Sequence, residues 1–139
     1  MINYKETARR WLEQSESDIK IAKKHLKDGE FSYACFLSEQ SAQKSLKGYL
    51  ISKRDIDLAI HSVSALAERA GRFNDMFKNF VENGISLDKY YLGTRYPDAL
   101  PGPLVPAKSY GKEEAEAAVE LAQQIFDLCQ ELTGYAQGE

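Results

Sequence analysis

The sequence predicts an all-α protein, an up-and-down antiparallel bundle of four main helices plus a short extra helix. Apolar residues recur at steps of three and four along most of the chain, and no segment of any length alternates apolar and polar residues as a strand does. Glycine and capping residues separate the periodic segments. With 139 residues the chain has the usual size of one domain, so we expect a single helical domain over residues 1–139.

The first two expected helices have clear ends. The first carries apolar or small residues from Ala8 to Leu26, and Asp28-Gly29 supplies its stop because glycine readily takes the left-handed conformation that closes a helix. The second begins near Phe31 and ends around Ser52-Lys53. It contains many alanines and serines, which predict a close approach to a neighbouring helix.

The middle of the chain is less regular. Ser62 is expected to cap a third helix with apolar positions as far as Phe80, kinked or split at Gly71. Asn83-Gly84 is a turn signal, and Ser86 is a plausible N-cap for the short extra helix.

The last helix, from Ala115 to Leu132, has the clearest periodicity, and acidic residues occupy its first turns, where they suit the helix dipole. The connection before it, residues 92–109, is roughly eighteen residues long, well above the usual loop. Four prolines restrict its backbone, so we expect a defined crossover.

Composition excludes several classes of protein. Hydrophobic residues make up 43% and charged residues 28%, which is ordinary for a soluble globular domain. There is no signal-peptide core and no apolar run long enough to span a membrane, so we expect a cytoplasmic protein without a membrane partner. The net charge of −3 is not the footprint of a general nucleic-acid binder. Cys35 and Cys129 lie on apolar helical faces and predict buried thiols, with neither a disulfide nor a metal site.

The stretch Tyr90-Tyr91-Leu92-Gly93-Thr94-Arg95-Tyr96-Pro97-Asp98 is the most informative in the chain. It interrupts a helical sequence with an aromatic cluster, one arginine and one aspartate. Loops held by rigid helices often carry function, so this mixture predicts a binding site.

The order of these elements and their marker residues resembles the HEPN family, the "higher eukaryotes and prokaryotes nucleotide-binding" domains, particularly the small prokaryotic members found beside minimal nucleotidyltransferases. The resemblance covers most of the chain. It rests on Trp11 with Asp18-Ile19 and on residues 28–36, 39–47, 61–66 and 91–98, the last being the most specific.

The resemblance implies a homodimeric helical bundle with a nucleotide- or RNA-related role, often beside a partner nucleotidyltransferase in a toxin-antitoxin-like pair. In ribonucleolytic members an arginine is followed after four to six residues by a histidine. Arg95 matches the arginine by context, but residues 100–102 stand where the histidine belongs, so the signature is incomplete. Arg54 and His61 satisfy the spacing formally, away from the family's catalytic position. Gln43 replaces a glutamate found in many relatives.

The residues around Arg95 are the first candidates for a site. Its guanidinium can offer a planar fork of donors to a phosphate, or form a structural ion pair with Asp98 or Glu39. Asp98 is a further candidate for ligand binding, or for tying the loop. Tyr91 and Tyr96 can stack on a base, or close the edge of the core.

The second helix and its connector supply the other candidates. Lys44 and Lys47 lie within one helical turn and predict a small positive patch, or two solvated side chains. Gln40 lies one turn before Lys44 and can bind a ligand or bond across the bundle. Histidine exchanges protons near neutral pH, so His61 is a candidate catalytic acid or base, or a structural residue.

We therefore expect a nucleotide- or RNA-binding helical protein that works with a nucleotidyltransferase, with no cofactor. Whether it is an enzyme is left open, because only Arg95 of the catalytic signature is in place. The alternative is a non-catalytic dimeric module whose function is protein interaction.

Overall fold

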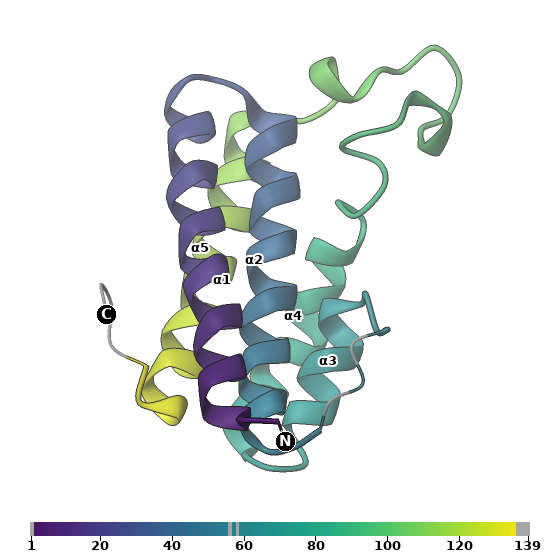
Figure 1. The fold of residues 1–139 in the computed structure, drawn as a ribbon. Helices are drawn as coiled ribbons and strands as arrows, with labels where there is room; N and C mark the ends of the chain where they lie inside the picture. Colours follow the sequence, from purple (N-terminus) through teal and green to yellow (C-terminus); the bar gives the residue numbers. More distant parts are fainter. Residues whose placement is uncertain (1, 56, 58, 136–139) are drawn as a thin grey trace.

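The computed structural model describes residues 2–55, 57 and 59–135, and this part of the chain contains helices and loops but no strand. The predicted all-α class is confirmed (Figure 1). The α-helices are α1 (Tyr4–Lys27), α2 (Phe31–Ser52), α3 (Val63–Ala70), α4 (Asn79–Asp88) and α5 (Lys112–Thr133). Short 3-10 helices span Asp75–Lys78, Pro97–Ala99 and Pro106–Lys108.

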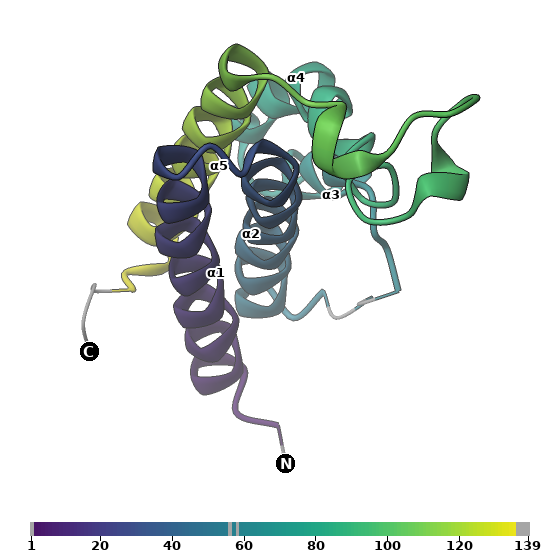
Figure 2. The ribbon, with the colours of Figure 1, turned by 90° about the horizontal axis from the view of Figure 1, so that it is seen from above.

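Helix α2 is the centre of the bundle, because it packs against α1, α5 and α3. Viewed from above, α1, α2 and α5 form one group, and α3 and α4 lie beside it (Figure 2). The chain runs up through α1 and down through both α2 and α5 in the view of Figure 1. The first residues of α1 therefore meet the last residues of α2 and α5 at one end of the bundle, and the crossover lies at the other.

Small residues bring α1 and α2 close together, as the sequence predicts. A Cβ atom added to Gly48 would lie 3.0 Å from Cγ of Leu12. One turn further along α1, the Ser15 hydroxyl lies 3.0 Å from the Ser41 hydroxyl and donates to the Ser41 carbonyl at 2.9 Å. These hydroxyl groups are buried and mutually hydrogen-bonded, so the tight interface leaves them paired.

Most of the predicted helix ends are confirmed. Gly29 follows α1 with a φ of 77°, the left-handed conformation expected of a closing glycine. The Ser62 hydroxyl accepts from the backbone N–H of Ala65 and caps α3. Gly71 follows the last residue of α3, so the long third helix is split there into α3, a 3-10 turn and α4.

The predicted turn at Asn83-Gly84 and the predicted N-cap at Ser86 are wrong, because α4 runs through all three residues. A Cβ atom on Gly84 would lie 3.0 Å from the backbone nitrogen of Ser64, so this glycine permits close contact between α3 and α4. The Ser86 hydroxyl donates to the Asn83 carbonyl one turn earlier instead of capping a helix.

We expect Gly84→Ala to lower the free energy of unfolding by about 1–3 kcal/mol, because the added methyl group meets the backbone of α3. Ser86→Ala is the matched control on the same helix and is expected to leave stability unchanged or slightly raised, since alanine favours a helix interior. Urea unfolding followed by circular dichroism measures both. A loss of about 1 kcal/mol in Ser86→Ala would instead indicate a lost N-cap.

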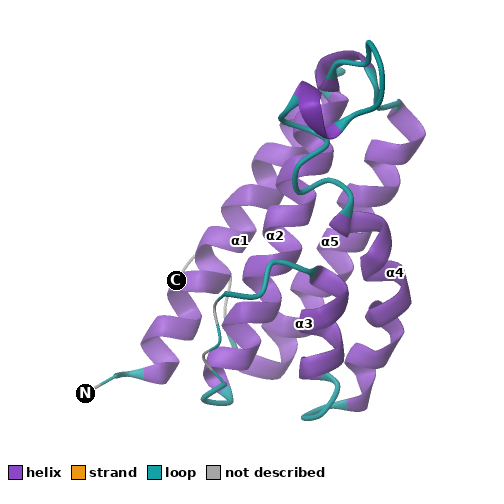
Figure 3. Ribbon diagram, turned by 90° about the vertical axis from the view of Figure 1, so that its right-hand side faces the viewer, coloured by secondary structure: helices purple, strands orange, loops and turns teal. Residues whose placement is uncertain are grey.

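The crossover between α4 and α5 projects beyond the bundle (Figure 3). Its two 3-10 turns begin at Pro97 and Pro106, and Pro106 is buried. The two cysteines, Cys35 and Cys129, are buried and unpaired as predicted, and burial raises the pKa of both thiols. Within the described ranges, no helix is both long and apolar enough to cross a membrane.

Candidate functional site

The turn after α4 is anchored from its inner side. Tyr90 is buried, and its hydroxyl donates to the Glu114 carboxylate of α5 at 2.7 Å. A Cβ atom on Gly93 would lie 2.6 Å from the Tyr110 hydroxyl, so glycine permits this approach. The buried Thr94 hydroxyl donates to the Tyr90 carbonyl at 2.6 Å. These contacts fix the turn on α5 and leave its next residue on the outer surface.

Arg95 lies on that outer surface among three aromatic rings. Its guanidinium carbon is 4.4 Å from the ring centre of Phe36 in α2, 5.3 Å from that of Tyr91 and 5.0 Å from that of Tyr96. Its Nε and Nη2 atoms donate to the Tyr91 carbonyl at 3.1 and 2.6 Å. The cation is therefore held in place by ring faces and one carbonyl.

The fork of Arg95 keeps donors for another group. Its side chain is exposed, and it makes no ion pair with any described carboxylate, neither Asp98 nor Glu39. The structural ion pair considered as an alternative is therefore not formed. A guanidinium with free donors and no carboxylate is suited to a phosphate.

A pocket of about 250 Å³ lies against Arg95 and the first turn of α2. Ser32 and Tyr33 of α2 line it together with residues of the crossover. The first turn of α2 contains no acidic residue, and its N-cap residue Glu30 makes no side-chain capping bond. The first backbone N–H groups of a helix favour anions, so the pocket combines a positive side chain with a positive helix end.

His61 is brought to the same place by α4. Its exposed ring stacks on Tyr91, with ring centres 5.2 Å apart and planes 13° apart. The Asp88 carboxylate accepts from the Ser62 hydroxyl at 2.8 Å and from the Val63 backbone N–H at 2.5 Å. These bonds tie the start of α3 to the end of α4, so histidine and guanidinium share one tyrosine ring.

Arg54 and His61, the alternative catalytic pair, contact different aromatic residues. The guanidinium carbon of Arg54 lies 5.0 Å from the ring centre of Tyr4 at the start of α1. His61 instead contacts Tyr91 after α4. Sequence spacing alone does not bring these two side chains onto the same surface.

Glu39 lies beneath the site and is fully buried. It accepts hydrogen bonds from the side-chain amides of Gln40, at 2.8 Å, and Gln43. Burial raises its pKa from the ordinary 4.5 to about 7; the two amides lower it, the Asp88 charge raises it, and the Arg95 charge lowers it. Gln43 is uncharged and donates a hydrogen bond to Glu39, whereas a second carboxylate at this position would repel it.

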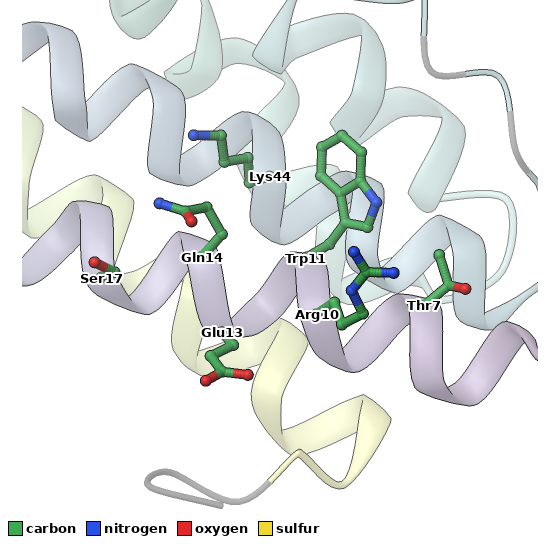
Figure 4. Close-up of a pocket in the computed structure, with 7 residues that line it drawn as sticks. All are labelled: Thr7, Arg10, Trp11, Glu13, Gln14, Ser17 and Lys44. Atoms are coloured by element: carbon green, nitrogen blue, oxygen red, sulfur yellow. The ribbon is translucent and has the colours of Figure 1, made fainter.

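The structure places Lys44 and Lys47 in different surroundings, so they are not the two solvated side chains considered as the alternative to a positive patch. The Lys44 ammonium lies 2.7 Å from the Asp18 carboxylate and borders a wide groove of about 680 Å³ beside Trp11 (Figure 4). Lys47 is buried, with its nitrogen 5.8 Å from the Trp11 ring centre. Burial lowers its pKa, while the charge of Glu39 raises it.

The structure thus gathers part of the predicted set. Side chains that share ring contacts are Arg95, Tyr91, Tyr96 and His61. Gln40 joins them indirectly through Glu39. The lysines lie further along α2 toward α1, and Asp98 is exposed in the next turn.

Sequence reasoning missed three contributors. Phe36 provides the ring nearest to the guanidinium, and Asp88 positions the histidine. Glu39 was considered only as an ion-pair partner. Its burial could have been predicted from the sequence. Glu39 falls between Cys35 and Ala42 on the apolar stripe of α2, where an acidic residue is unusual.

Fold and site together define a small helical bundle with a cationic and aromatic site beside its long crossover. A family model for the HEPN domain matches residues 8–132. The chain therefore belongs to the HEPN family, as the resemblance in the sequence indicates.

Individual relatives agree with this assignment. A protein of Methanocaldococcus jannaschii named "Putative toxin MJ1304" is 27% identical over 129 residues, which cover 87% of this chain and 84% of that protein. A stretch of human sacsin is 29% identical over 119 residues, 81% of this chain but 2% of sacsin.

Solved structures are similar over most of their length. The crystal structure of TT1696 from Thermus thermophilus has a TM-score of 0.82 and 37% identity, covering 89% of this chain and 96% of that one. ST0689, described as an archaeal HEPN homologue, has a TM-score of 0.72 and 28% identity, covering 91% and 97%.

Proposed function

We propose that this HEPN protein binds the phosphate of a nucleotide or an RNA at the pocket beside Arg95, and that it works with a nucleotidyltransferase in a toxin-antitoxin-like pair. The observation that carries the binding proposal is the exposed guanidinium, fixed by three rings and free of any described carboxylate. The name of the Methanocaldococcus relative supports the toxin half of the pair.

The aromatic residues favour a nucleotide over a simple anion. The Tyr96 side chain is 52% exposed and lies beside the guanidinium. An exposed ring can stack on a base while the neighbouring arginine binds the adjoining phosphate. Glu39 is fully buried, so it does not line the surface on which the ligand would lie.

The proposal is tested by a thermal-shift series with the four ribonucleoside monophosphates and a short single-stranded RNA. A ligand that binds only the folded protein raises the melting temperature, and we expect the RNA to give the larger rise. Fluorescence anisotropy of labelled RNA checks the same interaction directly. Unchanged melting temperature and unchanged anisotropy at low salt would contradict the proposal.

RNA cleavage is a further activity that we propose for this site, because His61 and Arg95 both contact the ring of Tyr91. His61 would accept the proton of the ribose 2′-hydroxyl, the 2′-oxygen would attack the phosphorus, and the 5′-oxygen of the next nucleotide would leave and take a proton from the histidine or from solvent. Arg95 would stabilise the charge that develops on the phosphate. We expect RNA incubated with purified protein to yield a cyclic phosphate end, and His61→Ala to abolish this product while RNA binding is retained. Intact RNA after prolonged incubation would leave the protein as a binder without catalysis.

The second candidate function is a dimeric interaction module, favoured by exposed apolar side chains on α4 and the crossover. They include Ile85, 60% exposed, and Leu92, 52% exposed. We expect light scattering to give the mass of a homodimer, and Leu92→Asp to shift it toward the monomer because a charge cannot be buried unpaired. The monomer mass in wild-type protein would contradict this.

The proposed partnership with a nucleotidyltransferase is tested separately, by co-elution of the two purified proteins in size-exclusion chromatography.

A further inference from the structure

A second pocket lies at the opposite end of the bundle from the crossover. Its volume is about 430 Å³, within the usual range for small-molecule sites. The start of α1 and the ends of α2 and α5 form its walls. We call it the basic pocket, because Lys5, Arg9, Lys53 and Arg54 line it and no described acidic residue does.

Only one of these four cations makes an ion pair among the described residues. Arg9 has one distant partner, with its Nη2 atom 3.8 Å from the Glu6 carboxylate. Among the described residues, the other three make no ion pair: Arg54 lies over the Tyr4 ring and Lys53 lies 5.7 Å from the Tyr49 ring centre. Four like charges around one cavity repel one another, and in a chain of net charge −3 the pocket stands out as a local positive region.

The helix dipoles explain only half of the cluster. Basic residues near the end of α2 are favourable there, because a helix C-terminus carries partial negative charge. Lys5 and Arg9 instead lie in the first two turns of α1, where the dipole opposes a cation. An anion between the two sets would relieve both the mutual repulsion and the unfavourable position on α1.

Backbone strain marks the same pocket. Arg54 has a φ of 64°, and among the described residues it alone combines a positive φ with a side chain. Its N–H donates to the Ile51 carbonyl and the Asp55 N–H to the Leu50 carbonyl, both at 2.9 Å, which is the helix ending at which glycine is usual. An arginine here accepts an unfavourable conformation and places a guanidinium over Tyr4 in the pocket.

We propose that the basic pocket binds a small ligand that carries a di- or triphosphate group. Two or more adjacent phosphates match the four cations, and Tyr4 lines the pocket beside them. This site is separate from the one beside Arg95 and does not depend on the function proposed there.

The test is isothermal titration of the whole chain with pyrophosphate, ATP and AMP at about 0.1 M salt. Pyrophosphate and ATP are expected to bind, and AMP much more weakly. Arg54→Gly removes the guanidinium and relieves the positive φ, so we expect at least about tenfold weaker binding with an unchanged or higher melting temperature. Lys5→Ala is expected to weaken binding as well.

Two controls separate the sites. All titrations are also run on Arg95→Ala, so that binding at the crossover site is removed from the signal, and Arg72→Ala, which removes an exposed arginine after α3, is expected to bind pyrophosphate like the wild type. ATP binding tighter than pyrophosphate would show that the nucleoside also contacts the pocket, and equal binding that phosphate alone does. The proposal is overturned if, in the Arg95→Ala background, neither pyrophosphate nor ATP binds, AMP binds as well as ATP, or the added Arg54→Gly change leaves binding normal.

Discussion

Arg95→Ala is expected to weaken RNA or nucleotide binding by about 2–4 kcal/mol, which is roughly 30-fold or more. The side chain supplies the exposed positive fork of the pocket, and no other described basic residue lines it. Arg95→Lys is expected to fall between alanine and wild type, because lysine keeps the charge but not the planar fork. Anisotropy titrations with labelled RNA measure all three proteins.

Folding must be separated from binding in this experiment. The guanidinium packs on three rings, and losing those contacts is expected to cost about 1–2 kcal/mol of stability. Binding is therefore compared at a temperature where circular dichroism shows each variant folded. Arg72→Ala is the matched control, because it removes another exposed arginine outside the pocket. Equal affinities of Arg95→Ala and wild type would reject the site.

Glu39→Gln is expected to stabilise the protein at pH 8 relative to the wild type, by about 3 kcal/mol more than it does at pH 4.5. The pKa of Glu39 rises from 4.5 to about 7 on folding, and each pKa unit corresponds to about 1.36 kcal/mol. The cause is burial of the carboxylate, and glutamine at the same position has no charge to bury.

The direction follows from proton binding. Well below pH 4.5 the carboxyl is protonated in both folded and unfolded chains, so its ionisation has no effect on stability there. As the pH rises from 4.5 to 7, the unfolded chain ionises more readily than the folded protein, and the wild type loses stability. Above pH 7 the penalty is complete and stays constant.

Urea unfolding of wild type and Glu39→Gln across this pH window measures the difference. Glu120→Gln is the control, because Glu120 is an exposed residue in the middle of α5 and its replacement is expected to give no such pH-dependent difference. A difference between Glu39→Gln and wild type that stays constant from pH 4.5 to 8, or falls as the pH rises, would show that the buried carboxylate carries no such penalty.

The helices were predictable because their signals are local. A 3.6-residue apolar period, the closing Gly29 and the capping Ser62 act within a few residues of one another. Gly84 led to a wrong prediction because its role is not local. A side chain at position 84 would collide with the backbone of Ser64 on another helix, and no local sequence pattern indicates that contact.

The position of the site in the chain was predictable, but the full set of residues that form it was not. The aromatic stretch around Arg95 located it, since its residue types are unusual for a connector. His61 joins it through Asp88, a contact between segments whose spacing no motif specifies. The depth of Lys47 also depends on tertiary packing, because helical periodicity places a residue on a face but does not say what covers that face.

The central claim, a phosphate site beside Arg95, is tested most directly by mapping the ligand in ¹H–¹⁵N NMR spectra during titration with a short single-stranded RNA. We expect amide shifts to change in the first turns of α2 and in residues 91–96, and these changes to vanish in Arg95→Ala. Shifts confined to other surfaces of the bundle, or the same changes in the variant, would contradict the claim.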